Sequence, residues 1–249
     1  MDDSIRLTYV GGPTALVEWR GLRLLTDPTF DPAGTRYELP GYTLVKTQDP
    51  ALPAAELGPV DAVLLSHDHH RDNLDDAGRE LLGAAARVLT TREGAERLGG
   101  GAIGMAPWDA VELGDVRVTA TPARHGPEGG DRGPVIGFVV EAGGRVLYVA
   151  GDTVWFEGVA EVARRFAVNV AVLNLGAARV AAAGPDPLTL TGAEAVEVAR
   201  AMPSATVVPL HFEGWEHFSE PRREAERALV EAGLSERVVW PPAGRAIAL

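Results

Sequence analysis

The feature that most constrains the fold of this chain is an apolar segment, Val60–Ser66 (VDAVLLS), that leads directly into a cluster of polar residues. An apolar run without alternation is typical of a strand that is covered on both faces. The polar loop His67–Asp75 follows, and then helical patterns at Asp76–Leu82 and Arg92–Leu98 flank a predicted strand at Arg87–Thr91. Strand, polar loop, helix and strand in this order are the rhythm of an α/β layer.

The chain before this segment is predicted to form an antiparallel meander and a long loop. Three short strand patterns, Ile5–Val10, Ala15–Trp19 and Leu22–Thr26, are separated by Gly-rich turns. Asp27-Pro28 then opens a Pro/Gly-rich stretch that runs to about Pro59. Because structureless connections of this length are uncommon, we interpret it either as a rim of the active site or as a surface excursion.

The second half of the chain repeats this organisation. Gly143-Gly144 is a hairpin signal, and Thr191-Gly-Ala-Glu194 is a capping box that opens a helix. The similar rhythm of the two halves predicts two sheets packed face to face with helices outside, in a single domain that spans residues 1–249. The strands expected here are Val116–Thr121, Val135–Glu141, Arg145–Ala150, Val170–Leu175, Thr206–Leu210, Arg237–Trp240 and Arg245–Leu249, and the helices are Glu157–Phe166, Gly192–Met202 and Glu220–Ala232.

Composition narrows the classes of function. The net charge of −12 disfavours nucleic acids and anionic membrane surfaces as partners. No apolar run approaches the roughly 20 residues that span a bilayer, and the N-terminus lacks a secretion signal, so we expect a cytoplasmic protein without an integral membrane segment. The chain has no cysteine, so any metal must be bound by His, Asp, Glu or backbone oxygen.

Three of the six histidines, His67, His69 and His70, lie within four residues directly after the predicted buried strand. Asp68 and Asp72 are interleaved with them. A loop at a strand end directs its side chains into the crevice above the sheet, where ligands usually bind in open α/β sheets. Imidazole nitrogens and carboxylate oxygens coordinate a cation such as zinc at about 2.0–2.2 Å. The loop is therefore a candidate metal site.

The alternative interpretation of this loop is a solvated turn in which Asn73 and Asp75 cap the next helix. Three further strand ends favour metal binding. His125, Asp152 and His211 each stand where a predicted apolar strand gives way to a loop. Each has an ordinary structural explanation by itself, but four separate strand ends with ligand-type side chains are difficult to explain together without a metal.

The ordered segments SHDHHRD, TPARH, AGDT and PLHFEGW resemble the metallo-β-lactamase superfamily, and the early LLTDPTF resembles its second-strand motif. The resemblance is closest to the branch that includes ascorbate-phosphate lactonases and N-acylphosphatidylethanolamine phospholipases, and it extends from about Ile5 to His211. It implies an α/β fold, a four-layer αββα sandwich, with one or two metals at one edge.

The resemblance also implies roles for individual residues. His67 and His69 match the first His-x-His pair, and His125 matches the distant histidine that completes the first metal site. Asp152 matches the aspartate that bridges two metals, and His211 matches the last histidine, a ligand of the second site.

The middle of the motif departs from the family pattern by an insertion of about one residue. We therefore expect His67 to act with either His69 or His70, and Asp72 to be the carboxylate of the second site. Asn73 takes the place of a histidine, and its neutral amide oxygen suits hard cations better than zinc. The second site is accordingly expected to be weak, filled by a hard ion such as manganese, or empty.

The predicted activity is hydrolysis of a small-molecule ester, lactone, amide or phosphodiester by water that the metal activates. Asp72 is the candidate catalytic residue, because it could orient that water or accept its proton. The cofactor would be one or two divalent ions, zinc as the first choice and manganese or iron as alternatives; no substrate-binding residue is predicted, and a homo-oligomer is compatible with the sequence. The alternative functions are a metal-poor binding or regulatory protein and a di-iron redox protein on the same fold.

Overall fold

The computed structural model describes residues 4–129 and 132–249. They form two compact units. Unit 1 consists of Met1–Ala106, Gly214–Glu216 and Pro241–Leu249, and unit 2 of Pro107–Glu213 and His217–Trp240. The chain thus passes from one unit to the other four times, and the short segment Gly214–Glu216 belongs to unit 1 although the residues on both sides of it belong to unit 2.

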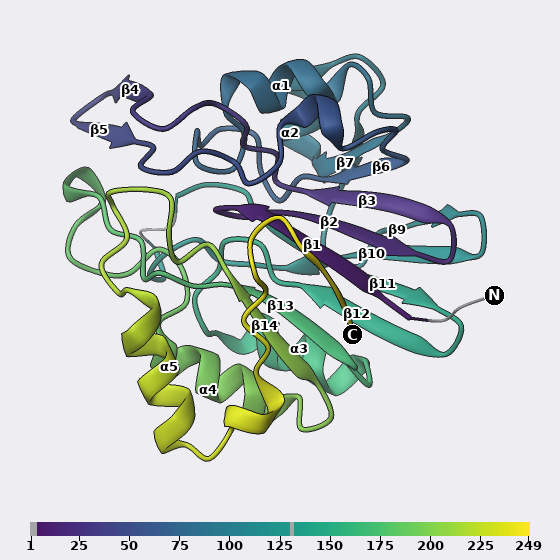
Figure 1. Ribbon diagram of the computed structural model, residues 1–249, viewed down its shortest axis with the longest axis vertical. Coiled ribbons are helices and arrows are strands. Elements are labelled where there is room, and N and C mark those ends of the chain that lie inside the picture. The colour runs from purple at the N-terminus through teal and green to yellow at the C-terminus, as the bar shows by residue number, and fades with distance from the viewer. Residues whose placement is uncertain (1–3, 130–131) are drawn as a thin grey trace. The chain divides into compact units, whose positions relative to one another are not determined.

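Unit 1 is built on a mixed seven-stranded sheet in the order β15-β1-β2-β3-β6-β7-β8 (Figure 1). The first three strands form the predicted antiparallel meander, whereas β3, β6, β7 and β8 run parallel. The carboxyl ends of these four strands therefore lie at one edge of the sheet. The strands are β1 (Arg6–Gly11), β2 (Thr14–Trp19), β3 (Leu22–Thr26), β6 (Ala62–Leu64), β7 (Val88–Thr91), β8 (Ile103–Met105) and β15 (Ala246–Ala248).

The two helices of unit 1, α1 (Asp76–Leu82) and α2 (Arg92–Leu98), have the predicted boundaries. Local chemistry explains this agreement, because the side chains of Asp75 and Thr91 each accept a hydrogen bond from a backbone N–H in the first turn of the helix that follows. Both helices pack on one face of the sheet. The shared core includes Leu16, Leu25, Val63 and Val88 from the strands, and Ala77, Leu81, Leu82 and Leu98 from the helices.

The stretch predicted as a loop up to Pro59 contains secondary structure. β4 (Arg36–Leu39) and β5 (Tyr42–Val45) form a hairpin, and Ala54–Glu56 form a 3₁₀ turn. Leu39 pairs with Tyr42, so Pro40 and Gly41 make a two-residue turn in which Gly41 has a φ of +87°. Proline followed by a glycine at positive φ is typical of a type II turn. Pro40-Gly41 is therefore the sequence signal that could have predicted this hairpin.

Unit 2 is built on a mixed six-stranded sheet in the order β14-β13-β12-β11-β10-β9. Strands β9 to β12 are antiparallel neighbours, and β12, β13 and β14 are parallel. It follows that β10, β12, β13 and β14 end at the same edge. The strands are β9 (Ala110–Leu113), β10 (Val116–Pro122), β11 (Ile136–Ala142), β12 (Arg145–Val149), β13 (Val170–Asn174) and β14 (Thr206–Leu210).

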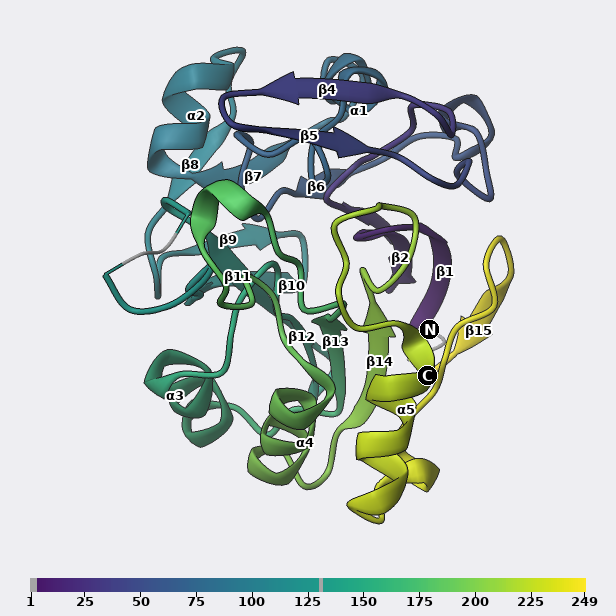
Figure 2. The same ribbon diagram turned by 90° about the vertical axis from the view of Figure 1, so that its left-hand side faces the viewer.

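Three helices lie in a row along one face of this sheet (Figure 2), and they are α3 (Glu157–Arg165), α4 (Gly192–Ala201) and α5 (Arg222–Glu231). The predicted capping box at the start of α4 is present, with Thr191 and Glu194 exchanging hydrogen bonds. The core under the helices is drawn from side chains that share a face of the sheet. It includes Val139, Tyr148, Ala171 and Val207 from the strands and Val159, Val162, Ala195, Val198, Ala225 and Leu229 from the helices.

One predicted strand of this unit, Arg237–Trp240, is wrong. Ser235–Arg237 form a 3₁₀ turn, and only Val238 pairs with a strand, through an isolated bridge to Val207. The physical reason lies in Arg237, whose guanidinium donates hydrogen bonds to backbone carbonyls at the end of α4 and after it. The segment is therefore held by a side chain and not by a ladder of backbone hydrogen bonds.

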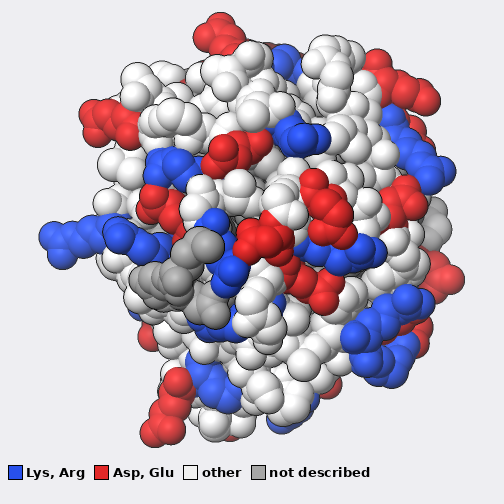
Figure 3. Space-filling view, turned by 90° about the vertical axis from the view of Figure 1, so that its right-hand side faces the viewer, with Lys and Arg blue, Asp and Glu red and all other residues white. Residues whose placement is uncertain are grey.

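The surface carries both signs of charge. Figure 3 shows acidic and basic side chains interspersed over the face in view. Several are paired on the surface, such as Arg117 with Glu112 at 2.7 Å. Among the residues that the structure describes, no helix is long and apolar enough to cross a membrane.

Candidate metal centre

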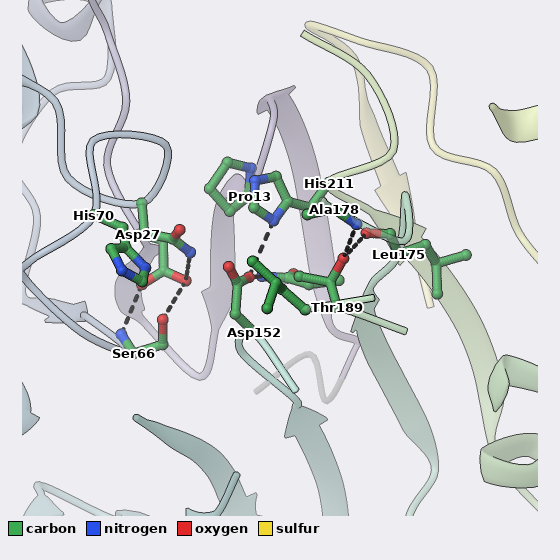
Figure 4. Close-up of polar contacts among 12 residues, drawn as sticks. Pro13, Asp27, Ser66, His70, Asp152, Leu175, Ala178, Thr189 and His211 are labelled. Atoms are coloured by element: carbon green, nitrogen blue, oxygen red, sulfur yellow. Dashed lines mark hydrogen bonds and ion pairs between the residues drawn. The ribbon is translucent and has the colours of Figure 1, made fainter. Parts of the chain in front are cut away.

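Asp27 organises the edge of the sheet in unit 1. It directly follows β3, is 2% exposed and has a φ of +24°. Its carboxylate accepts hydrogen bonds from the backbone N–H of Ser66 at 2.6 Å, from Ser66 Oγ at 2.9 Å and from Asn73 Nδ2 at 3.3 Å (Figure 4). Asp27 therefore holds both ends of the histidine loop. Asp27 was not among the predicted site residues, although its place directly after a strand in LLTDPTF is a signal in the sequence.

The structure pairs two of the three clustered histidines. His67 is fully buried, and its Nε2 lies 3.0 Å from His70 Nδ1. The His67 Nδ1 lies 2.9 Å from Ser66 Oγ, so the ring is oriented from both sides. His69 is exposed, and its ring centroid lies 4.9 Å from that of His67. His70 therefore faces the buried ring of His67, and these two side chains present ligand atoms within 4.8 Å of each other.

Asp68, in the middle of the cluster, serves a different purpose. Its carboxylate accepts two hydrogen bonds from Arg97, at 2.9 and 2.5 Å, and its backbone oxygen accepts one from Arg79 at 3.1 Å. Burial alone would raise the pKa of the Asp68 carboxyl, but interactions with Arg97 and His69 outweigh it and hold the pKa well below its usual range. Asp68 is thus an anchor that ties the loop to α1 and α2.

The end of the loop brings two more polar side chains into the interior. Asp72 is 5% exposed and Asn73 is fully buried. The Asn73 Nδ2 is bonded to Asp27, whereas its Oδ1 has no hydrogen-bond partner among the residues that the structure describes. A buried oxygen atom without a hydrogen-bond partner destabilises the fold by roughly 1–3 kcal/mol, so a cation that binds oxygen would stabilise this position. Asp75 caps α1, in agreement with the alternative role considered for it.

In unit 2, His125 is held by a backbone carbonyl. It follows β10, is 4% exposed, and its Nδ1 lies 2.7 Å from the carbonyl oxygen of Leu188. A carbonyl only accepts, so Nδ1 carries a proton, and in the neutral imidazole Nε2 then has the lone pair. Leu188 is itself fixed by the adjacent Thr189, whose hydroxyl donates to the oxygen of Leu175 and accepts from the backbone of Ala178 (Figure 4).

Asp152 lies among the strand ends of unit 2. It is 1% exposed, and its Oδ1 accepts a hydrogen bond from Asn174 Nδ2 at 2.7 Å and lies 3.0 Å from His211 Nδ1 (Figure 4). Its other oxygen, Oδ2, lies 3.8 Å from His125 Nε2. His211 is fully buried with a φ of +54°, a conformation that non-glycine residues seldom adopt. Such backbone geometry is concentrated at functional sites.

Strand order explains why these residues meet. His125, Asp152, Asn174 and His211 come from the ends of β10, β12, β13 and β14, which all end at the same edge of the sheet. Asn174 was missed in the sequence, where it ends an apolar strand (VAVLN) and could have been noticed as a polar terminus. The backbone carbonyl of Leu188 carries no sequence signal, because every residue has one.

Comparisons with known proteins agree with this chemistry. A sequence family described as the beta-lactamase superfamily domain matches residues 22–212. A protein from Opitutus terrae named "UPF0173 metal-dependent hydrolase" is 33% identical over 220 residues, which cover 84% of this chain and 85% of that protein.

Two solved structures show the fold. The isothiocyanate hydrolase from Delia radicum gut bacteria superposes with a TM-score of 0.85 and 24% identity, over 98% of this chain and 99% of that one. The metallo-beta-lactamase fold protein YhfI from Bacillus subtilis superposes with a TM-score of 0.64 and 15% identity, over 100% of both chains. The predicted α/β fold class is thereby confirmed as the metallo-β-lactamase fold, with two mixed sheets flanked by helices.

Proposed function

The chain belongs to the UPF0173 metal-dependent hydrolases of the metallo-β-lactamase superfamily, and from this premise we propose that it hydrolyses a small-molecule ester, lactone, amide or phosphodiester with one or two divalent cations. The isothiocyanate hydrolase with the same fold adds an isothiocyanate to the substrates worth testing. The lactonase and phospholipase branch that the sequence resembles stays a prediction.

The observation that carries this proposal is the pair of His125 and Asp152. Their facing atoms, Nε2 and Oδ2, are 3.8 Å apart, which is longer than a hydrogen bond. Two ligands that each lie about 2.0–2.2 Å from one cation are roughly 3–4 Å from each other. The other polar atom of each side chain is already engaged, by the carbonyl of Leu188 and by Asn174. The two facing atoms are therefore oriented as ligands of one ion would be.

The donor atoms of the chain fit a divalent cation. They are imidazole nitrogens and carboxylate oxygens without thiolate, a set that zinc, manganese and iron all accept, and zinc is the first choice because histidine predominates. The buried Oδ1 of Asn73, which has no hydrogen-bond partner in the described part of the chain, supports an additional oxygen ligand. A harder ion such as manganese would suit that position better than zinc.

We propose the following ligands. His67, His70 and His125 would hold the first cation, and the exposed His69 is the less favoured partner of His67. Asp152, His211 and Asp72 would hold a second ion. We also propose that residues 1–249 act as the single domain that the sequence predicts.

The other residues of the site prepare these ligands. The Leu188 carbonyl selects the tautomer of His125 that can bind, and Asn174 and His211 hold one oxygen of Asp152 in place. A bound cation would supply Lewis acidity, which lowers the pKa of a water molecule and polarises the electrophilic group of the substrate. Asp72 is proposed to orient the attacking water and to accept its proton.

The test combines metal analysis with a panel of model substrates. Elemental analysis of the purified protein is expected to find one or two divalent ions per chain, and Asp152→Asn is expected to lose at least one of them together with about 100-fold or more of the hydrolytic rate. The matched control is Asp115→Asn, because Asp115 is exposed in the turn before β10, at the other end of that strand from His125. This variant should keep both properties.

Two outcomes would contradict the proposal. Stoichiometric iron with oxygen consumption and no hydrolysis would favour the di-iron redox alternative. A folded protein that takes up no divalent ion and turns over no ester, lactone, amide, phosphodiester or isothiocyanate would favour a binding or regulatory role.

A further inference from the structure

The one lysine of the chain, Lys46, is buried. The chain has 23 Lys and Arg residues, and all of them except Lys46 are arginines. Lys46 follows β5, and its side chain is 5% exposed. Its ammonium lies 3.0 Å from Asp75 Oδ2 and 5.5 Å from the centre of the Trp215 ring. Neither contact follows from the sequence, where Lys46 lies in the stretch interpreted as a rim of the active site or a surface excursion.

Asp75, the partner of Lys46, connects this lysine to the histidine loop. Its side chain is fully buried and accepts two further hydrogen bonds. Oδ1 accepts from the backbone N–H of Gly78 at 2.8 Å as the cap of α1, and Oδ2 accepts from the backbone N–H of Asp31 at 2.7 Å. Asp75 is also three residues after Asp72, so its position sets where the ligand loop ends.

The backbone around Lys46 connects it to a second segment of unit 1. Lys46 forms an isolated antiparallel bridge with Trp215. The N–H of Thr47 donates to the oxygen of Gly214 at 2.8 Å, and the N–H of Glu216 donates to the oxygen of Val45 at 3.1 Å. Residues 45–47 and 214–216 are therefore joined on both sides of the lysine, and its ammonium lies over the Trp215 ring and contacts Asp75.

Gly214 is three residues after His211 in the chain, and Asp75 is three residues after Asp72. On this basis we propose that Lys46 is a positioning residue for the metal site, because Lys46 ties the end of the Asp72 loop to the segment 214–216, which begins three residues after His211. The proposal rests on the proposed function, in which Asp72 and His211 are ligands of the second cation.

Two physical arguments favour a positioning role over a purely stabilising one. Burying an ion pair removes both charges from water, and this desolvation offsets most of their attraction, so the pair adds little net stability compared with an apolar pair. The pair does, however, favour one geometry. Burial lowers the pKa of the Lys46 ammonium, although the charge of Asp75 acts in the opposite direction. The gain from this pair is then a defined position of two chain segments.

The test uses three variants of the full chain. Lys46→Met removes the ammonium, and the double variant Lys46→Met with Asp75→Asn removes both charges; the amide oxygen still accepts from Gly78 N–H as the cap of α1, whereas the bond from Asp31 N–H is lost. Leu7→Ala is the matched control, because Leu7 is fully buried in β1 of the same unit and is absent from every contact of Lys46 described above. Affinities for zinc are measured by competition with a chromophoric chelator, and the cobalt-loaded proteins are compared by their visible absorption spectra.

We expect Leu7→Ala to lower the melting temperature without changing metal affinity or the cobalt spectrum. The double variant is expected to fold and to bind the more weakly held zinc ion at least tenfold less tightly, with an altered cobalt spectrum; Lys46→Met should show at least the same loss if it folds. The proposal is overturned if the double variant binds both ions like the wild type, or if Leu7→Ala loses affinity equally. Wild-type protein that binds metal without hydrolysis would refute the proposed function and leave the positioning role standing, whereas wild-type protein that binds no metal would refute both.

Discussion

The ion pair of Asp68 and Arg97 gives a prediction whose size follows from the structure. Replacing Arg97 by methionine removes two hydrogen bonds, at 2.9 and 2.5 Å, from a carboxylate that is 3% exposed. Breaking a buried pair from one side costs about 3–5 kcal/mol. The Arg97 side chain is 47% exposed, so solvent screens the pair, and we expect Arg97→Met to lower the free energy of unfolding by about 2 kcal/mol at pH 7.

The loss of stability in Arg97→Met is also expected to depend on pH. In the wild type the pKa of Asp68 lies well below 3.8, so its stabilising effect is complete above that pH and is lost as the pH falls through the lowered pKa. Without Arg97, the pKa of Asp68 is expected to rise, because burial is then opposed only by His69 and a backbone hydrogen bond. The variant then holds a proton on Asp68 at a higher pH than the wild type does, which relieves the unpaired buried charge at low pH. The difference between wild type and variant should therefore be smaller at pH 4 than at pH 7.

The assay is urea unfolding of metal-free protein at both pH values, followed by circular dichroism and tryptophan fluorescence. Arg117→Met is the control, because Arg117 and Glu112 form a pair whose side chains are 54% and 58% exposed, and it should change stability by no more than about 0.5 kcal/mol. The reasoning is refuted if Arg97→Met is no more destabilising than Arg117→Met, or if its deficit is the same at pH 4 and pH 7.

Four further predictions concern the metal centre and its supports. Asn174→Leu should weaken zinc binding by about 10–100-fold, because Asp152 loses the donor that orients it; unchanged affinity in a chelator competition would speak against that role. Thr191→Ala should lower the free energy of unfolding in urea by about 1 kcal/mol through loss of the cap of α4, and no change would show that the capping box is dispensable. Gly176→Ala should lower the melting temperature, since Gly176 has a φ of +84° and an added Cβ would lie 2.6 Å from the oxygen of His211; a variant as stable as the wild type would contradict this. Removing metal with a chelator should lower the melting temperature and adding zinc back should restore it, whereas identical melting curves would exclude a metal that binds the folded state.

The elements that the sequence predicted well are those that local chemistry determines. α1 and α2 begin and end where predicted, because Asp75 and Thr91 cap them, and the capping box of α4 was readable as four letters. The β4–β5 hairpin was missed within a stretch interpreted as loop, even though Pro40-Gly41 was visible. The short strand β8 was missed because three residues are too few to show an alternating pattern of apolar and polar side chains. Its backbone pairing with β7 stabilises it as a strand.

The candidate site divides in a similar way. Ligand-type side chains at four strand ends could be selected from the order of apolar and polar residues, and so could the family to which the chain belongs. The choice between His69 and His70 could not, because adjacent loop residues differ only in the direction that the folded backbone gives them. The structure turns His70 toward His67 and leaves His69 exposed.

The available chemistry can be read from the amino-acid order alone: six histidines, no cysteine, and carboxylates at the ends of apolar strands. The fold selects which of these atoms are held together. Asn174 on Asp152, the Leu188 carbonyl on His125 and Lys46 on Asp75 join residues that are 22, 63 and 29 positions apart. The sequence gives side-chain types and their local spacing directly. Contacts between distant residues arise instead from strand order and loop closure, which depend on packing across the whole unit.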